Sequence, residues 1–292
     1  MSVAASETLV AAAVASGAAP SADGTVERAA LRRVLRILGS LLIGLSATTA
    51  LWWVFVEVSN TEPLVTKAPP AVWRYLFRGA DAGANRSLIF GELGTTLRDA
   101  GLGYLSGTIA AVAVSSLFVL KRGVEATVMP IAMVLRSVPL VAMVPVLTLV
   151  FGRDILAVTV ISGIITFFPS LVNLTFGLRN VPAQGVDLLR AYGAGPTRTW
   201  RTLRLPYAVP SLFASMRIAV PGAVIGALLA EWLATGKGLG YLMLRAQSTF
   251  DYTAIWASVA VLTFTTLVLY AVVGLIETPV LARFDPDRLR ES

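Results

Sequence analysis

The sequence contains no cysteine and no histidine, and only 14% of its residues are charged. Without those two residue types the chain has no disulfide, no thiol nucleophile, no imidazole base and none of the common zinc-ligand sets. Soluble domains carry about 25% charged residues, so the low charge also argues against a soluble protein. We therefore expect no catalytic residue, no metal site and no cofactor.

Apolar residues are abundant instead, at 56% of the 292 residues, where about 45–50% is typical. An integral membrane protein accommodates this excess because its outer side chains face lipid. The net charge of +7 agrees, since basic residues of membrane proteins gather in loops on one side. No basic patch is interleaved with exposed aromatic residues, so nucleic acid is not an expected partner.

Six apolar runs are long enough to cross a bilayer as helices. They cover roughly residues 37–58, 100–120, 125–151, 155–177, 209–235 and 253–278. The third contains Pro130, Pro139 and Pro145, so we expect a kinked or broken helix there. The predicted fold is all-α and polytopic, with about six transmembrane helices and a cytoplasmic coupling-helix loop.

The chain divides by composition into four parts. These are a disordered cytoplasmic tail (1–34), a first transmembrane helix with an extracytoplasmic segment (35–90), a core of five transmembrane helices (91–283) and a second cytoplasmic tail (284–292). Fourteen of the twenty-four basic residues fall on the side of the two termini, seven on the other side and three within spans. That ratio predicts cytoplasmic termini in a multi-pass protein of the cell membrane.

The longest charged interruption between apolar runs is residues 185–206, GVDLLRAYGAGPTRTWRTLRLP. It predicts a helix that ends at Gly193, a turn through Ala194, and a short second helix capped by Thr197 and ended by Pro206. The second helix carries Arg198, Arg201 and Arg204 at three-residue spacing, with Trp200 and Leu203 as apolar contacts. A membrane-surface loop whose arginines contact lipid phosphates is the alternative interpretation.

This loop resembles the EAA loop of the inner-membrane subunits of binding-protein-dependent ABC importers. Asp187-Leu188-Leu189 stands where the family has Glu-Ala-Ala, and Gly193, Leu203, Leu205 and Pro206 follow at the family's intervals. The resemblance extends over roughly 90–283 and includes Arg136-Ser137-Val138-Pro139, Phe167-Phe168-Pro169 and Gly238-Leu239-Gly240. It is strongest to the nitrate, sulfonate and taurine-type permeases and to their relatives that handle thiamine precursors or riboflavin.

The resemblance implies a type I importer permease that pairs with a second copy and receives solute from an extracytoplasmic binding protein. It also implies two identical ATPase subunits. They would hydrolyse the ATP, because the chain lacks a Gly-x4-Gly-Lys-Ser/Thr loop of its own. The residues implied in ATPase coupling are Asp187, Leu188, Leu189, Gly193, Ala194, Arg198, Trp200, Arg201, Leu203, Leu205 and Pro206. A secondary transporter or channel without an ATPase, and a membrane-embedded enzyme, are the alternatives.

Among the charged residues within predicted spans, Arg136 and Glu231 most invite a role in the translocation path. A charge at mid-bilayer costs about 2.5–3.5 kcal/mol on insertion scales, so each needs a partner or water. For Glu231 the alternative is simple hydration near the outer end of the fifth span. For Arg136 the alternative is bonding to backbone carbonyls near Pro139.

Overall fold

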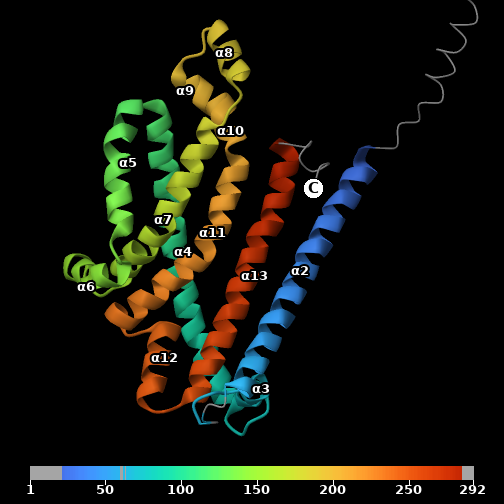
Figure 1. Ribbon diagram of the computed structural model, residues 1–292, viewed down its shortest axis with the longest axis vertical. Helices are drawn as coiled ribbons and strands as arrows, with labels where there is room; N and C mark the ends of the chain where they lie inside the picture. The colour runs from blue at the N-terminus through green and yellow to red at the C-terminus, as the bar shows by residue number, and fades with distance from the viewer. Residues whose placement is uncertain (1–21, 60–61, 63, 285–292) are drawn as a thin grey trace, which may run out of the picture.

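The computed structural model describes residues 22–59, 62 and 64–284, and every regular element in that part of the chain is a helix. Five helices are long and apolar enough to cross a membrane: α2 (Ala22–Val58), α4 (Ala82–Leu120), α7 (Ile155–Arg179), α11 (Val209–Ala230) and α13 (Tyr252–Phe284). They run along one bundle (Figure 1). A bent pair supplies a sixth span if it is counted as one. The predicted all-α membrane fold is confirmed.

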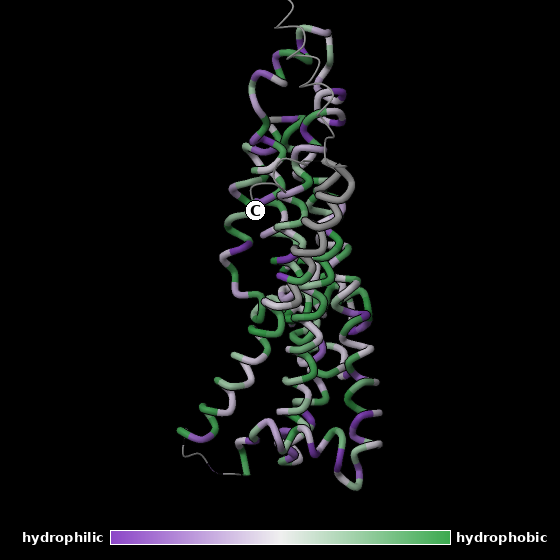
Figure 2. The backbone as a smooth tube through the Cα atoms, turned by 90° about the vertical axis from the view of Figure 1, so that its right-hand side faces the viewer, coloured by the Kyte–Doolittle hydropathy of each residue, from purple (hydrophilic) through white to green (hydrophobic). Residues whose placement is uncertain are grey.

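Shorter helices occupy the two ends of the bundle and the bent span. They are α3 (Pro69–Phe77), α5 (Arg122–Ser137), α6 (Leu140–Phe151), α8 (Ala183–Ala191), α9 (Pro196–Thr199), the π-helix η1 (Trp200–Arg204), α10 (Leu205–Tyr207), the π-helix η2 (Glu231–Thr235) and α12 (Gly238–Ser248). Helices α8 and α9 project at what we call the loop end, and α3 and α12 lie toward the far end (Figure 1). Many hydrophilic segments lie toward these two ends (Figure 2).

Two helices begin earlier than the apolar runs suggest. Of the predicted N-terminal tail, residues 1–21 lie outside the described residues, whereas 22–34 belong to α2. Helix α4 starts at Ala82 and has 39 residues, a length of about 58 Å at 1.5 Å per residue. Because the hydrocarbon core is only about 30 Å thick, the polar first turns of α4 extend past it. The predicted tail 284–292 lies outside the described residues except for its first residue.

The third span is broken, as its prolines predict. Helices α5 and α6 meet at an angle of 106°. Val138 has ψ 125° and Pro139 has ψ 119°, so neither is helical. The residue before a proline is pushed out of the helical region, which places the break there. Pro130 and Pro145 lie inside α5 and α6 without ending them.

The centre of the bundle is a close contact of α4, α7 and α11. Ser162 of α7 donates a hydrogen bond to the carbonyl of Ala223 in α11 over 2.9 Å, and Thr166 donates to the carbonyl of Gly103 in α4 over 3.2 Å. A methyl group on Gly103 would overlap the Ser162 side chain, and one on Gly226 would press on the Ser162 backbone. Small residues therefore let three backbones approach, which is how helices associate in lipid.

At the far end two tryptophans join the first and last spans. Trp52 of α2 and Trp256 of α13 stack with ring centroids 5.4 Å apart. The Trp52 indole donates to the Lys67 carbonyl over 3.1 Å, and the Trp256 indole donates to the Val65 carbonyl over 2.9 Å. Indoles with one apolar face and one donor suit a membrane interface. They fix the linker between α2 and α3 against the bundle.

A carboxylate joins α3 to the start of α13 at the same end. Asp251 accepts the Ala254 backbone N–H over 3.1 Å, and its other oxygen lies 3.5 Å from the Tyr75 hydroxyl. Burial and the neighbouring carboxylate raise the pKa of Tyr75 to about 12. The hydroxyl therefore keeps its proton at neutral pH and remains a donor to Asp251.

The central contact predicts that two glycines of α4 respond oppositely to alanine. Gly103→Ala should destabilise the protein by about 1–3 kcal/mol, because the added methyl meets a packed side chain. Gly101→Ala is the matched control, since nothing lies within 4 Å of its added methyl, and it should gain up to about 1 kcal/mol of helix propensity. Unfolding midpoints of the detergent-solubilised protein measure both, and equal midpoints would contradict the packing described.

Candidate functional site

The first half of the central loop is a helix closed by a left-handed glycine. Gly193 has φ +73°. The N–H of Ala194 bonds to the Leu189 carbonyl and the N–H of Gly193 bonds to the Arg190 carbonyl, each over 2.9 Å. This pair of bonds defines a Schellman motif, in which glycine takes the left-handed position at no steric cost. The predicted end of this helix at Gly193 is confirmed.

The second half differs from its predicted boundaries. Gly195, and not Thr197, precedes the first helical residue, and Pro196 occupies the first turn of α9. Pro206 lies in the first turn of α10, and the chain stays helical to Tyr207. At Pro196 proline fits, because the missing N–H of a first-turn residue has no partner to lose, whereas Pro206 follows η1 within a continuous helical run. Thr197 as a cap and Pro206 as a terminator were therefore wrong.

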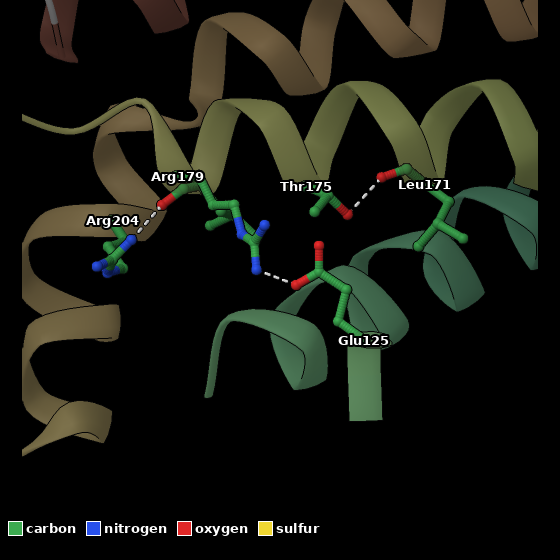
Figure 3. A network of polar contacts seen from close by, with 6 residues as sticks. Glu125, Leu171, Thr175, Arg179 and Arg204 are labelled. Atoms are coloured by element: carbon green, nitrogen blue, oxygen red, sulfur yellow. Dashed lines mark hydrogen bonds and ion pairs between the residues drawn. The ribbon is translucent and has the colours of Figure 1, made fainter. Parts of the chain in front are cut away.

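One contact holds the loop to a flanking span, and two more hold the parts of the loop together. Arg204 donates from Nη1 to the Leu178 carbonyl in the last turn of α7 over 2.9 Å, as Figure 3 shows at the end of that helix. A methyl on Gly185 would lie 3.2 Å from the Leu203 side chain, so α8 and η1 are in close contact. Thr199 is buried and donates to the Gly195 carbonyl. Arg204 was missing from the predicted coupling residues, although its position just before Leu205-Pro206 pointed to it.

The remaining predicted coupling residues divide by exposure. Leu189, Ala194, Trp200, Leu203 and Pro206 are partly buried, while Asp187, Leu188, Arg198, Arg201 and Leu205 are exposed. On α8 the apolar side chains of Leu188 and Tyr192 are 58% and 79% exposed. Because residues four apart share a helix face, they form one apolar patch at the tip. Tyr192 was not among the predicted coupling residues.

Similarity to known proteins adds to this geometry. Residues 103–284 match the family described as binding-protein-dependent transport system inner membrane component. The chain belongs to this family. It is an ABC importer permease subunit, a multi-pass inner-membrane protein of a transport system that also includes an ATPase and a solute-binding protein. The family assignment favours this function over a secondary transporter or channel.

Several curated relatives of the permease are permeases as well. A probable ABC transporter permease protein of Haemophilus influenzae is 30% identical over 236 residues, which are 81% of this chain and 94% of the relative. The formylaminopyrimidine transport permease protein ThiX of Halalkalibacterium halodurans is 31% identical over 193 residues, or 66% of this chain and 77% of the relative. The aliphatic sulfonates transport permease SsuC of Bacillus subtilis, described as putative, is 26% identical over 64% of each chain.

A second polar site of the permease surrounds the N-terminus of α12. The N–H of Gly238 donates to Glu92 over 2.8 Å, that of Leu239 donates to the Thr96 hydroxyl over 2.9 Å, and that of Gly240 donates to Glu231 over 2.7 Å. The first amides of a helix have no partner within the helix. Here α4 and η2 supply three acceptors, and two of them are carboxylates that also complement the helix dipole.

Glu231 is wholly buried in this site, at 0% exposure. The interpretation that it is simply hydrated near the end of its span was therefore wrong. Gly238 has φ +87°, and a methyl group on Gly238 would overlap the Glu231 carboxylate. The short glycine-rich segment is thus required for the carboxylate to reach the amides.

The α4 residues beside Glu231 were missed because α4 was predicted to start too late. Glu92, Thr96 and the buried Asp99 lie at positions i, i+4 and i+7 of α4, one helix face. That polar spacing was the signal available in the sequence. It falls in residues that precede the apolar run expected at roughly 100–120.

Arg136 lies apart from this site. It is exposed in the last turn of α5, immediately before the break to α6. Across the described part of the chain its side chain makes no hydrogen bond or ion pair, so the suggested bonding to carbonyls near Pro139 is not seen. The structure does not bring Arg136 and Glu231 together.

The α12 site predicts a graded response at position 231. Glu231→Ala should destabilise the permease by about 1–3 kcal/mol, because the Gly240 amide stays buried without an acceptor. Glu231→Gln should destabilise the permease less, since the amide oxygen of glutamine still accepts the bond from the Gly240 N–H. Hydrogen exchange at the start of α12, together with the unfolding midpoint, measures the effect. Equal protection in Glu231→Ala and the unmodified permease would rule out this role.

Proposed function

We propose that residues 183–207 form a cytoplasmic coupling element on which a separate ATPase subunit docks. The distribution of basic residues supports this orientation, with fourteen on the side of this loop and seven on the other. In the structure α2 begins, and α13 ends, toward the loop end (Figure 1). The exposed pair Leu188 and Tyr192 supplies an apolar contact for the ATPase beyond the ends of the spans.

One observation carries the coupling mechanism: the chain is almost continuously helical from Pro196 to Thr235. The last loop turn passes directly into α11, since the Leu212 N–H bonds to the Ala208 carbonyl over 2.9 Å. Arg204 bonds the same loop to α7. A displacement of α8 and α9 by a closing ATPase would therefore move both α7 and α11.

The same helix extends this movement to the far end. Helix α11 continues into η2, whose first residue Glu231 bonds the N-terminus of α12. A tilt of α11 would thus change the position of α12. We propose that ATP is hydrolysed in the separate subunit and that this helix transmits its closure to the opposite side of the membrane.

We propose that the permease works as a pair of identical copies with a pair of identical ATPase subunits. The bent span supports a second copy as neighbour, because α5 and α6 expose a run of large apolar side chains. These are Ile131, Met133, Val134, Leu135, Val138, Val141, Val146, Leu149 and Val150. The solute-binding protein would deliver at the far end, where α3 and α12 lie.

The names of relatives suggest the solute class. They mention formylaminopyrimidine, riboflavin, aliphatic sulfonates and nitrate. We propose a small solute of anionic or heteroaromatic character for this permease. Arg136 is our candidate contact for an anion, because its exposed guanidinium stands at the elbow of the broken span.

A glycine pair tests the coupling role. Gly193→Ala places a side chain at φ +73°, which costs roughly 1–2 kcal/mol and should weaken ATPase retention roughly five- to thirty-fold. Gly195→Ala is the matched control, because Gly195 has φ −70° and open space around it. Co-purification of the ATPase and ATP-driven uptake into proteoliposomes are the measurements. Full retention in Gly193→Ala, or uptake by the permease alone with a proton gradient, would refute the proposal.

Arg136→Gln tests the contact with solute. Uptake by the reconstituted transporter should fall, while ATPase retention should stay normal, because Arg136 makes no bond that the described fold needs. Arg153→Gln controls for the loss of one positive charge, because Arg153 lies in the turn between α6 and α7. Unchanged uptake by a normally assembled Arg136→Gln transporter would contradict a solute contact at Arg136.

A further inference from the structure

The permease has a cavity of about 720 Å³ on the bundle side of the coupling element. Its walls come from the last turn of α4, the end of α7, and helices α8 and α9 with η1. Three arginines line it, Arg179, Arg190 and Arg204, and apolar side chains of Leu120 and Val186 line it as well. None of the described lining residues is acidic, so the lining is basic, although Glu125 and Asp187 partly offset the charges of Arg179 and Arg190.

The arginines of this cavity retain donors for a ligand. Arg179 is paired with Glu125 of α5, and Arg204 bonds the Leu178 carbonyl, both visible in Figure 3. Arg190 is 68% exposed and lies 3.5 Å from the equally exposed Asp187, a contact of little strength in water. A guanidinium has five N–H donors, so Arg179 and Arg190 keep donors for a ligand beyond their contacts with Glu125 and Asp187.

The cavity lies where two of the candidate spans end. Leu120 is the last residue of the span formed by α4, and Arg179 is the last residue of the span formed by α7. The cavity therefore lies at the loop-side ends of two candidate spans, with Leu120 and Arg179 on its span side and Val186 and Arg190 on its loop side.

We propose that this cavity binds a phosphate group, supplied by the headgroup of an anionic phospholipid of the leaflet that the loop faces. Guanidinium groups recognise phosphate through two parallel charge-assisted hydrogen bonds. The acyl chains would lie along Leu120, while the phosphate bridges Arg179 and Arg190. The proposal uses the cytoplasmic orientation of the loop given above and is independent of ATPase docking there.

Other parts of the loop fit a protein partner better than this cavity does. The apolar tip residues Leu188 and Tyr192 do not line the cavity, and neither do the exposed Arg198 and Arg201. The cavity instead joins α8 to the last turn of α4. A bound phospholipid would hold the coupling element at a fixed angle to the bundle. The starting position from which the ATPase moves this element would then depend on anionic lipid.

Native mass spectrometry of the purified full-length permease tests the site. The probes are dioctanoyl-phosphatidylglycerol, dioctanoyl-phosphatidylcholine and inorganic phosphate. We expect phosphatidylglycerol to bind and phosphatidylcholine to bind at least tenfold more weakly. Arg190→Gln should weaken the affinity for phosphatidylglycerol about fivefold, because one basic residue near an anionic headgroup contributes about that much. Arg190 is exposed, so its replacement should leave the fold intact.

Arg201→Gln is the matched control, because it removes one exposed arginine of the same loop that does not line the cavity. It should leave phosphatidylglycerol binding unchanged. Inorganic phosphate that binds as tightly as the lipid, with the same loss in Arg190→Gln, would support the phosphate site and identify free phosphate as its source.

Three outcomes would overturn the proposal. The first is that the two lipids bind equally, and the second is that Arg201→Gln loses as much affinity for phosphatidylglycerol as Arg190→Gln does. The third is that ATPase subunits displace all phosphatidylglycerol and Arg190→Gln weakens only the binding of the ATPase. The last result would assign the cavity to an acidic segment of the ATPase. ATPase retention is measured separately with the glycine pair, so failure of the lipid site leaves the coupling role intact.

Discussion

The close contact of α4, α7 and α11 is the constraint on which the rest of the permease depends. Lipid surrounds the spans, so no hydrophobic force drives the helices together, and tight packing of small residues must do so. Gly103 and Gly226 leave room for the Ser162 region of α7, and hydrogen bonds from Ser162 and Thr166 cross to the neighbouring helices. The result is a rigid unit to which both polar sites are attached.

Helix α11 connects those two sites. At one end it continues from the loop that Arg204 bonds to α7, and at the other it enters η2, where Glu231 caps α12. Helices transmit displacement because their internal hydrogen bonds resist bending, and α11 is also packed along α7. A glycine-rich segment at each end, around Gly193 and Gly238, supplies the left-handed backbone that lets the chain turn.

Local signals predicted local features well. Proline at 139 located the break between α5 and α6, because its effect on the preceding residue is steric and needs no neighbour. Gly193 was predicted as a helix end for a similar reason. Thr197 and Pro206 were assigned wrongly, since each is compatible with more than one position near a helix terminus. The start of α4 was missed because polar residues such as Glu92 made a buried helix face resemble a linker.

The sequence alone determined the class of the protein. The apolar runs and the low charge indicated a polytopic membrane protein. The unequal distribution of basic residues and the spacing from Gly193 to Pro206 indicated a permease with a coupling loop. All of these features can be read from the order of residues along the chain. Only the tertiary structure placed Glu231 against the amides of α12, Arg204 on the end of α7 and three arginines around one cavity. Those contacts join residues 9 to 26 positions apart, and no local pattern encodes which of them meet once the helices have packed.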